Sequence, residues 1–206
     1  MRRVFAGLAA LAIAGSADAA TIVNGSFEIG IPDPGAFATV PAGDTNITGW
    51  TVGGAGVDYI GTYWFAQDGV RSVDLSALAA GSLSQDIATD VGTRYRVSFY
   101  MSGNPDGAPS IKTLTASAGA ESADYSIDAS TFASPDLIWT RYTLAFTALA
   151  SSTTLTFASG NDSAWGAALD NVAITAIPEA STWAMMIAGI GFVGLASRRR
   201  RATVSA

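Results

Sequence analysis

The sequence has no cysteine and no histidine. Without cysteine, an exported domain has no disulfide to support it and must be stabilised by its own buried apolar area. The same absence excludes thiolate zinc sites and cysteine nucleophiles. Without histidine, the chain lacks the usual general base, the imidazole metal ligand and a Ser-His-Asp triad. These two absences are the strongest argument in the sequence against an enzyme.

Charge is also scarce and unevenly placed. Charged residues make up 14% of the chain, whereas a soluble domain usually carries about 25%. Residues 21–178 contain fifteen acidic residues but only five basic ones, which are Arg71, Arg94, Arg96, Lys112 and Arg141. Nucleic acid is therefore excluded as a partner, because phosphate binding needs a basic surface. An acidic domain of this kind would instead attract cations such as calcium.

The N-terminus has the three parts of a secretory signal peptide. Arg2 and Arg3 form a positive n-region, residues 4–14 form an apolar h-region, and Ala17-Asp18-Ala19 is an A-x-A cleavage site. We expect residues 1–19 to be a signal helix that is cut after Ala19. The alternative is an N-terminal helix that stays buried in the mature protein.

The C-terminus also has three parts. Pro178-Glu179-Ala180 is followed by a stretch without charge, residues 181–197, and then by Arg198-Arg199-Arg200-Arg201. A helix of that stretch would be about 26 Å long, slightly short for a bilayer core of about 30 Å. The arginines should stop transfer and stay cytoplasmic, which leaves residues 20–177 on the outer side of the membrane.

This C-terminal region, residues 178–206, resembles the PEP-CTERM sorting signal of bacterial envelope proteins, with Ala180 in place of the second proline. The resemblance implies recognition by an exosortase-type membrane protease, cleavage near Pro178 and Glu179, and delivery to the cell surface or the extracellular matrix. The membrane helix would then anchor the protein only transiently. The alternative is a permanent single-pass anchor.

Residues 20–177 read as one all-β domain. Short apolar-alternating runs are separated by clusters rich in Gly, Ser, Thr and Asp, which is typical of a sandwich or a barrel. The clearest predicted strands are residues 93–101, 139–147, 153–159 and 168–175. In the first of them, Tyr95, Val97, Phe99 and Met101 share one face. We expect a loop at residues 31–48 and a turn at 104–109.

Two signatures near the ends of this domain carry a family resemblance. Asn24-Gly25-Ser26-Phe27-Glu28 lies near the mature N-terminus, and Leu169-Asp170-Asn171-Val172 lies on the last predicted strand. With Gly49-Trp50 and Gly92-x-x-Tyr95 between them, the order resembles the choice-of-anchor C family and related galactose-binding-like domains. The resemblance implies a jelly-roll β-sandwich and, less directly, association with carbohydrate.

The same resemblance implies a structural calcium site. In similar jelly rolls an ion often ties the first and last strands together, which makes Glu28 and Asp170 the candidate ligands. Asp170 has the same parity as Val172 and Ile174, so we expect it to point into the core, where a carboxylate is costly unless it is paired. The alternative is that Asp170 accepts backbone hydrogen bonds and Glu28 is solvated.

Aromatic side chains supply a candidate site for a sugar. The candidate contacts are Tyr59, Tyr63, Trp64, Asp68 and Trp165, because aromatic faces stack on sugar rings and a carboxylate accepts bonds from hydroxyl groups. The alternative is that these aromatic residues fill the core. Tyr63, Trp64 and Phe65 are consecutive, however, so a regular strand cannot bury all three on one face. Trp50 and Trp139 are interpreted as core residues.

The sequence thus predicts an exported, non-enzymatic protein that binds envelope polysaccharide. Two alternatives remain open: a structural matrix or adhesion protein that acts through protein contacts, and a hydrolase that uses carboxylates alone. A glycosidase would need two carboxylates about 5–10 Å apart across a cleft, and no spacing in the sequence marks such a pair.

Overall fold

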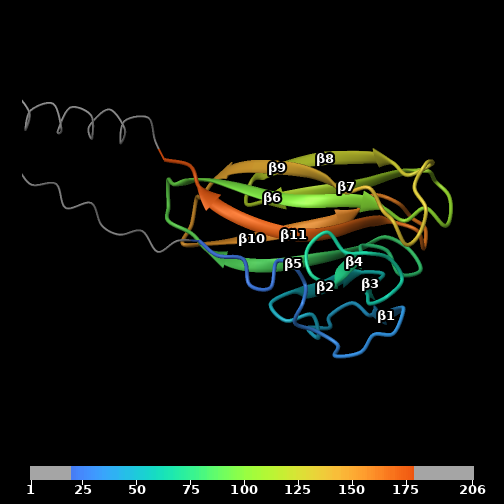
Figure 1. Ribbon diagram of the computed structural model, residues 1–206. Coiled ribbons are helices and arrows are strands. Elements are labelled where there is room, and N and C mark those ends of the chain that lie inside the picture. Colours follow the sequence, from blue (N-terminus) through green and yellow to red (C-terminus); the bar gives the residue numbers. More distant parts are fainter. Residues whose placement is uncertain (1–19, 179–206) are drawn as a thin grey trace, which may run out of the picture.

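The computed structural model describes residues 20–178, which form two stacked β-sheets (Figure 1). Within this range the chain has no helix that is long and apolar enough to cross a membrane. The strands are β1 (Phe37–Val40), β2 (Thr51–Gly54), β3 (Val57–Ile60), β4 (Ser72–Asp74), β5 (Gly81–Ala88), β6 (Arg94–Gly103), β7 (Ile111–Ala118), β8 (Glu121–Asp128), β9 (Thr140–Thr147), β10 (Ser152–Ser159) and β11 (Ala167–Ala176).

The strand order confirms the predicted all-β jelly-roll sandwich. One sheet has six strands in the order β1-β3-β4-β11-β6-β9, and the other has five in the order β2-β5-β10-β7-β8. From β4 to β11 the chain passes repeatedly from one sheet to the other, and each described pairing is antiparallel. We call the first the six-stranded sheet and the second the five-stranded sheet.

The core between the sheets follows the predicted alternation. Tyr95, Val97, Phe99 and Met101 of β6 are all buried there. The ring of Phe99 meets that of Phe157 edge-on, with centroids 5.0 Å apart. Trp50 is a core residue as predicted. Trp139, also predicted to be a core residue, is only half-buried and packs against a smaller apolar cluster on the outer face of the six-stranded sheet.

The two end signatures of the sequence meet at a β-bulge in β11. The pairing of β11 with β6 shifts between Asp170 and Ala173, and Asn171 has a φ of 47°. The bulge frees the N–H of Val172 to bond the carbonyl of Gly25 at 2.8 Å. A side chain at Gly25 would collide with the carbonyl of Val172, so this close approach requires glycine.

The bulge also corrects the predicted direction of Asp170. Val172 and Leu169 both pack in the main core, which a strand without a bulge does not allow for residues three apart. Asp170 therefore lies on the outer face of the six-stranded sheet, although it is fully buried there by a loop. The parity argument failed because it carried the alternation through a residue with positive φ.

The remaining local predictions are mixed. The turn at 104–109 is present between β6 and β7, whereas the predicted loop at 31–48 contains β1. The predicted signal peptide with Ala17 and Ala19, the residues Glu179 and Ala180, the helix at 181–197 and Arg198 to Arg201 lie outside the described residues.

One side of the sandwich is closed by two tyrosines. The hydroxyl of Tyr125 in β8 donates to the carbonyl of Thr143 in β9 at 2.9 Å, and the hydroxyl of Tyr142 in β9 donates to the carbonyl of Ser126 in β8 at 3.0 Å. Since β8 and β9 are edge strands of different sheets, these bonds satisfy carbonyls that an exposed edge would offer to another chain.

Candidate functional site

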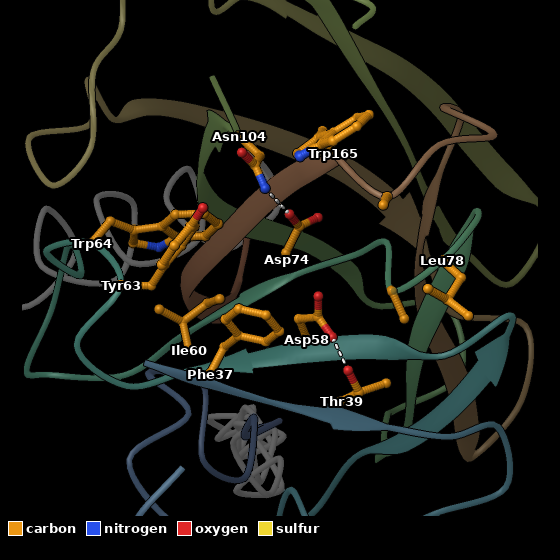
Figure 2. Close-up of a pocket in the computed structure, with 12 residues that line it drawn as sticks. Phe37, Thr39, Asp58, Ile60, Tyr63, Trp64, Asp74, Leu78, Asn104 and Trp165 are labelled. Atoms are coloured by element: carbon orange, nitrogen blue, oxygen red, sulfur yellow. Dashed lines mark hydrogen bonds between the residues drawn. The ribbon is translucent and has the colours of Figure 1, made fainter. Parts of the chain in front are cut away.

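A pocket of about 220 Å³ lies on the outer face of the six-stranded sheet (Figure 2). It forms there because Val57, Tyr59 and Val73 point into the core, so the residues that alternate with them on β3 and β4 point outward. Loops at one end of the sandwich complete the walls. The lining residues are Phe37, Thr39, Asp58, Ile60, Tyr63, Trp64, Asp74, Ala77, Leu78, Asn104, Ala164 and Trp165.

Two carboxylates form the polar part of the pocket. Asp58 of β3 and Asp74 of β4 are directly opposite in the antiparallel register, which places such side chains side by side on one face. The carboxylate of Asp58 accepts the hydroxyl of Thr39 at 2.6 Å. That of Asp74 accepts the side-chain amide of Asn104 at 2.8 Å and the backbone N–H groups of Ser76 and Gly166 at 3.0 and 3.2 Å.

Burial makes both carboxylates hold protons more tightly than usual. Asp74 is 1% exposed, and desolvation raises its pKa to about 7 in spite of its hydrogen bonds. The nearby charge of Asp58 acts in the same direction. Burial also raises the pKa of Asp58, which the bond from Thr39 partly offsets.

Trp165 presents an indole ring that is 40% exposed. One side of the ring packs on Gly107, where an added Cβ would lie 2.2 Å from the indole. The backbone of Trp165 is fixed by Lys112, whose Nζ donates to the carbonyls of Trp165 and Gly107 at 2.8 and 2.7 Å. Lys112 is fully buried, and burial lowers its pKa. The exposed indole is therefore held in place before any ligand arrives.

Tyr63 and Phe37 add two more aromatic rings to the wall of the pocket. The two rings meet edge-on with centroids 5.5 Å apart. The hydroxyl of Tyr63 donates to Asp106 at 2.6 Å, and this bond, together with burial and the charge of Asp106, raises the pKa of Tyr63 to about 12. In the view of Figure 2, Tyr63 lies to the left of Asp74 and Trp165 lies above it.

The structure brings only part of the predicted aromatic group to the pocket surface. Tyr63 and Trp165 line it with accessible atoms, whereas Trp64 is 2% exposed and donates its indole N–H to Ser72 at 2.9 Å. Tyr59 is fully buried in the core, and its hydroxyl donates to the carbonyl of Phe27 at 2.6 Å. The prediction that a sugar stacks on Tyr59 or Trp64 was therefore wrong, because neither ring has a free face.

Asp68 lies in the loop between β3 and β4 and is not among the residues that line the pocket. Its backbone N–H, together with that of Gln67, donates to one oxygen of Asp170 at 2.9 and 2.7 Å. One oxygen of Glu28 accepts the N–H groups of Val70 and Arg71, each at 2.8 Å. Glu28 and Asp170 thus hold the same loop from two sides, as the hydrogen-bonding alternative for Asp170 expected.

The arrangement around these two carboxylates does not fit a calcium ion. Three of their four carboxylate oxygens accept backbone N–H groups: one oxygen of Glu28 and both oxygens of Asp170, the second of which accepts the N–H of Asn171. Calcium instead needs oxygen ligands around it. Residues 20–178 also contain no group of three or more acidic, histidine or cysteine side chains that would hold a metal ion. Burial, opposed by these bonds, raises the pKa of Asp170 to about 7.

Sequence reasoning missed Asp58, Asp74 and Asn104 as pocket residues. The available signal was local: Asp58 stands in Val57–Ile60 and Asp74 in Ser72–Leu75, each between apolar residues of a short strand. A carboxylate at such a position must face solvent or a partner. The pattern did not show that β3 and β4 are neighbouring strands, which is what brings the two side chains together.

Chemically, the pocket offers hydrogen-bond acceptors beside aromatic faces. The carboxylate of Asp58 accepts from hydroxyl or ammonium groups, while the Trp165, Tyr63 and Phe37 rings suit the apolar face of a ring-shaped ligand. The two carboxylates lie on one wall rather than on opposite sides of a cleft, which is not the arrangement that glycoside hydrolysis uses.

The chain is similar in sequence to part of a much larger curated protein. Halomucin of Haloquadratum walsbyi (strain DSM 16790 / HBSQ001) is 36% identical over 159 residues, which is 74% of this chain and 2% of that protein. The chain thus spans a small fraction of the curated relative that it matches.

Solved structures with similarity include two carbohydrate-binding modules. The CBM22-1 xylan-binding domain from Paenibacillus barcinonensis Xyn10C has 18% identity and a TM-score of 0.48, over 68% of this chain and 99% of that one. TmCBM61, solved in complex with beta-1,4-galactotriose, has 18% identity and a TM-score of 0.43, over 75% and 96% of the two chains.

Family models cover nearly all of the sequence that follows the predicted signal peptide. Residues 176–201 match the PEP-CTERM protein-sorting motif, which confirms the predicted sorting signal and with it export to the cell surface. Residues 20–175 match the model described as "Protein of unknown function (DUF642)". The chain therefore belongs to the DUF642 family and carries a PEP-CTERM protein-sorting motif at its C-terminal end.

Proposed function

We propose that this protein is a non-catalytic module that binds polysaccharide of the cell envelope or the extracellular matrix in the pocket beside Trp165. The observation that carries the proposal is the indole of Trp165, which is exposed over a pocket with carboxylate acceptors yet fixed by Gly107 and Lys112. A ring that is already ordered loses little conformational freedom when a sugar stacks on it.

The position of the pocket supports the same function. Strand β11 begins beside the pocket, where Gly166 bonds Asp74, and ends at Ala176, two residues before Pro178. The pocket and the start of the sorting motif therefore lie at opposite ends of the sandwich (Figure 1). Processing by an exosortase-type protease at the motif would leave the pocket facing away from the point of attachment.

The two alternatives have less support. A carboxylate-only hydrolase would need a second acid across the pocket, but Asp58 and Asp74 share one wall. A matrix protein acting by strand addition would need an open sheet edge. The edges at β8 and β9 are tied together by Tyr125 and Tyr142, and the other two edge strands, β1 and β2, have only four residues each.

The proposal is tested with the full chain on a panel of immobilised polysaccharides. We expect saturable binding that Trp165→Ala weakens about tenfold, since stacking on an aromatic ring is worth about 1.5 kcal/mol. Phe65→Ala is the matched control, because Phe65 is also a large exposed aromatic residue but does not line the pocket. Absence of binding, or equal loss in both variants, would overturn the proposal.

A further inference from the structure

We infer that the pocket prefers an amino sugar with a free ammonium group, such as glucosamine, and that Asp58 selects it. This inference rests on the proposed function, because it names the class of sugar that the same pocket would bind.

The charge of the lining supports a cationic ligand. The pocket is lined by Asp58 and Asp74, and none of its lining residues is basic. At the rim, Asp106 adds a further carboxylate, which accepts the hydroxyl of Tyr63. Lys112 contacts the backbone of the lining residue Trp165, but its ammonium is buried and donates to two backbone carbonyls. A uronic acid would therefore be repelled, while an ammonium group would be attracted.

Asp58 is the carboxylate that a ligand reaches. Asp74 is almost fully buried and already accepts three hydrogen bonds, so it is not the carboxylate that a ligand contacts. Asp58 is only half-buried, and Thr39 bonds one of its oxygens. Figure 2 shows its other oxygen turned toward Asp74. That oxygen is placed to accept an N–H of an ammonium in a charge-assisted bond.

The aromatic walls suit the remainder of the same ligand. A glucosamine ring has an apolar face that fits against the indole of Trp165, and its ammonium is attracted to the face of an aromatic ring. Carboxylates beside an amine also favour its protonated form. A neutral sugar would use the same stacking contact but would leave the charge of Asp58 uncompensated.

Three oligosaccharides of the same linkage and length separate these contributions. They are a glucosamine oligomer, its N-acetylated form and the corresponding glucose oligomer, each titrated calorimetrically against the full chain at neutral pH and low salt. We expect the glucosamine oligomer to bind about tenfold to 100-fold more tightly than the other two, because a charge-assisted bond replaces a neutral one. The preference should shrink at high salt.

The chain provides a close control for the key variant. Asp58→Asn removes a charge from a carboxylate that accepts a cross-strand threonine, and Asp86→Asn does the same on the five-stranded sheet, where Asp86 accepts Thr154 at 2.5 Å. Asp58→Asn should abolish the preference for the amine while glucose binding persists, which also shows that the variant folds. Asp86→Asn should keep the preference.

Each other outcome overturns the inference. Equal affinity for all three oligosaccharides would refute selection of the amine but leave polysaccharide binding intact. An equal effect of Asp86→Asn would mean that the acidic domain attracts cations without a specific site. If these oligomers fail but another polysaccharide on the panel binds through Trp165, only the amino-sugar inference fails. If no polysaccharide binds, the proposed function fails as well.

Discussion

The buried carboxylates predict an unusual dependence of stability on pH. Asp74 and Asp170 are at most 1% exposed, and burial raises the pKa of each from 3.8 to about 7. Between these two values the folded protein keeps protons that the unfolded chain releases. The free energy of unfolding should therefore be largest at the acidic end of this window and fall as the pH rises through about 7.

The magnitude follows from one proton per carboxylate. Each group contributes a slope of about 1.4 kcal/mol per pH unit, so both together approach about 2.8 kcal/mol per unit between about pH 5 and 6. Hydrogen bonds from Ser130 lower the pKa of Asp128 and oppose this trend. Asp128 is exposed, however, so solvent screens its effect.

Urea unfolding at pH values from about 5 to 8 measures this slope. Asp74→Asn and Asp170→Asn should each remove up to half of it, since an amide does not titrate and the raised pKa of Asp58 adds to the wild-type slope. Each Asn variant can keep one oxygen on the two backbone N–H groups that the carboxylate now accepts. A wild-type stability that is flat or rises with pH over this range would refute the reasoning.

Three further perturbations test single contacts. Lys112→Met should lower the free energy of unfolding by about 2–3 kcal/mol in urea, because it leaves the carbonyls of Gly107 and Trp165 without their charged donor; an unchanged midpoint would contradict the anchoring role. Tyr59→Phe should cost about 1–2 kcal/mol by the same assay, through the lost bond to Phe27, and a neutral effect would contradict it. Because backbone N–H groups already occupy most oxygens of Glu28 and Asp170, calcium should leave the melting temperature unchanged, and a rise that EGTA reverses would contradict this reasoning in favour of the ion that the sequence predicts.

Strand positions were predictable where alternation is regular and long. Strand β6 spans Arg94–Gly103, close to the predicted residues 93–101, and its apolar face is the one that the sequence indicates. The alternation in β11 was misread, since Asn171 with its positive φ inserts one extra residue opposite β6. A bulge depends on the approach of Gly25, which is distant in the sequence.

The candidate site was harder to predict for a physical reason. Whether a loop aromatic is buried depends on which surface the loop covers, so Trp64 and Trp165 looked equivalent in sequence although one is buried and the other exposed. The pairing of Asp58 with Asp74 needs the sheet topology, because neither residue has a charged neighbour that marks it.

The course of β11 also has a mechanical consequence. It is a central strand between β4 and β6, and it runs from the pocket end of the sandwich to the end where the sorting motif begins. If the protein is held beyond Pro178 and a ligand is pulled, the load passes along this strand. Its ladder hydrogen bonds lie perpendicular to that direction, so they would be sheared together rather than unzipped one at a time.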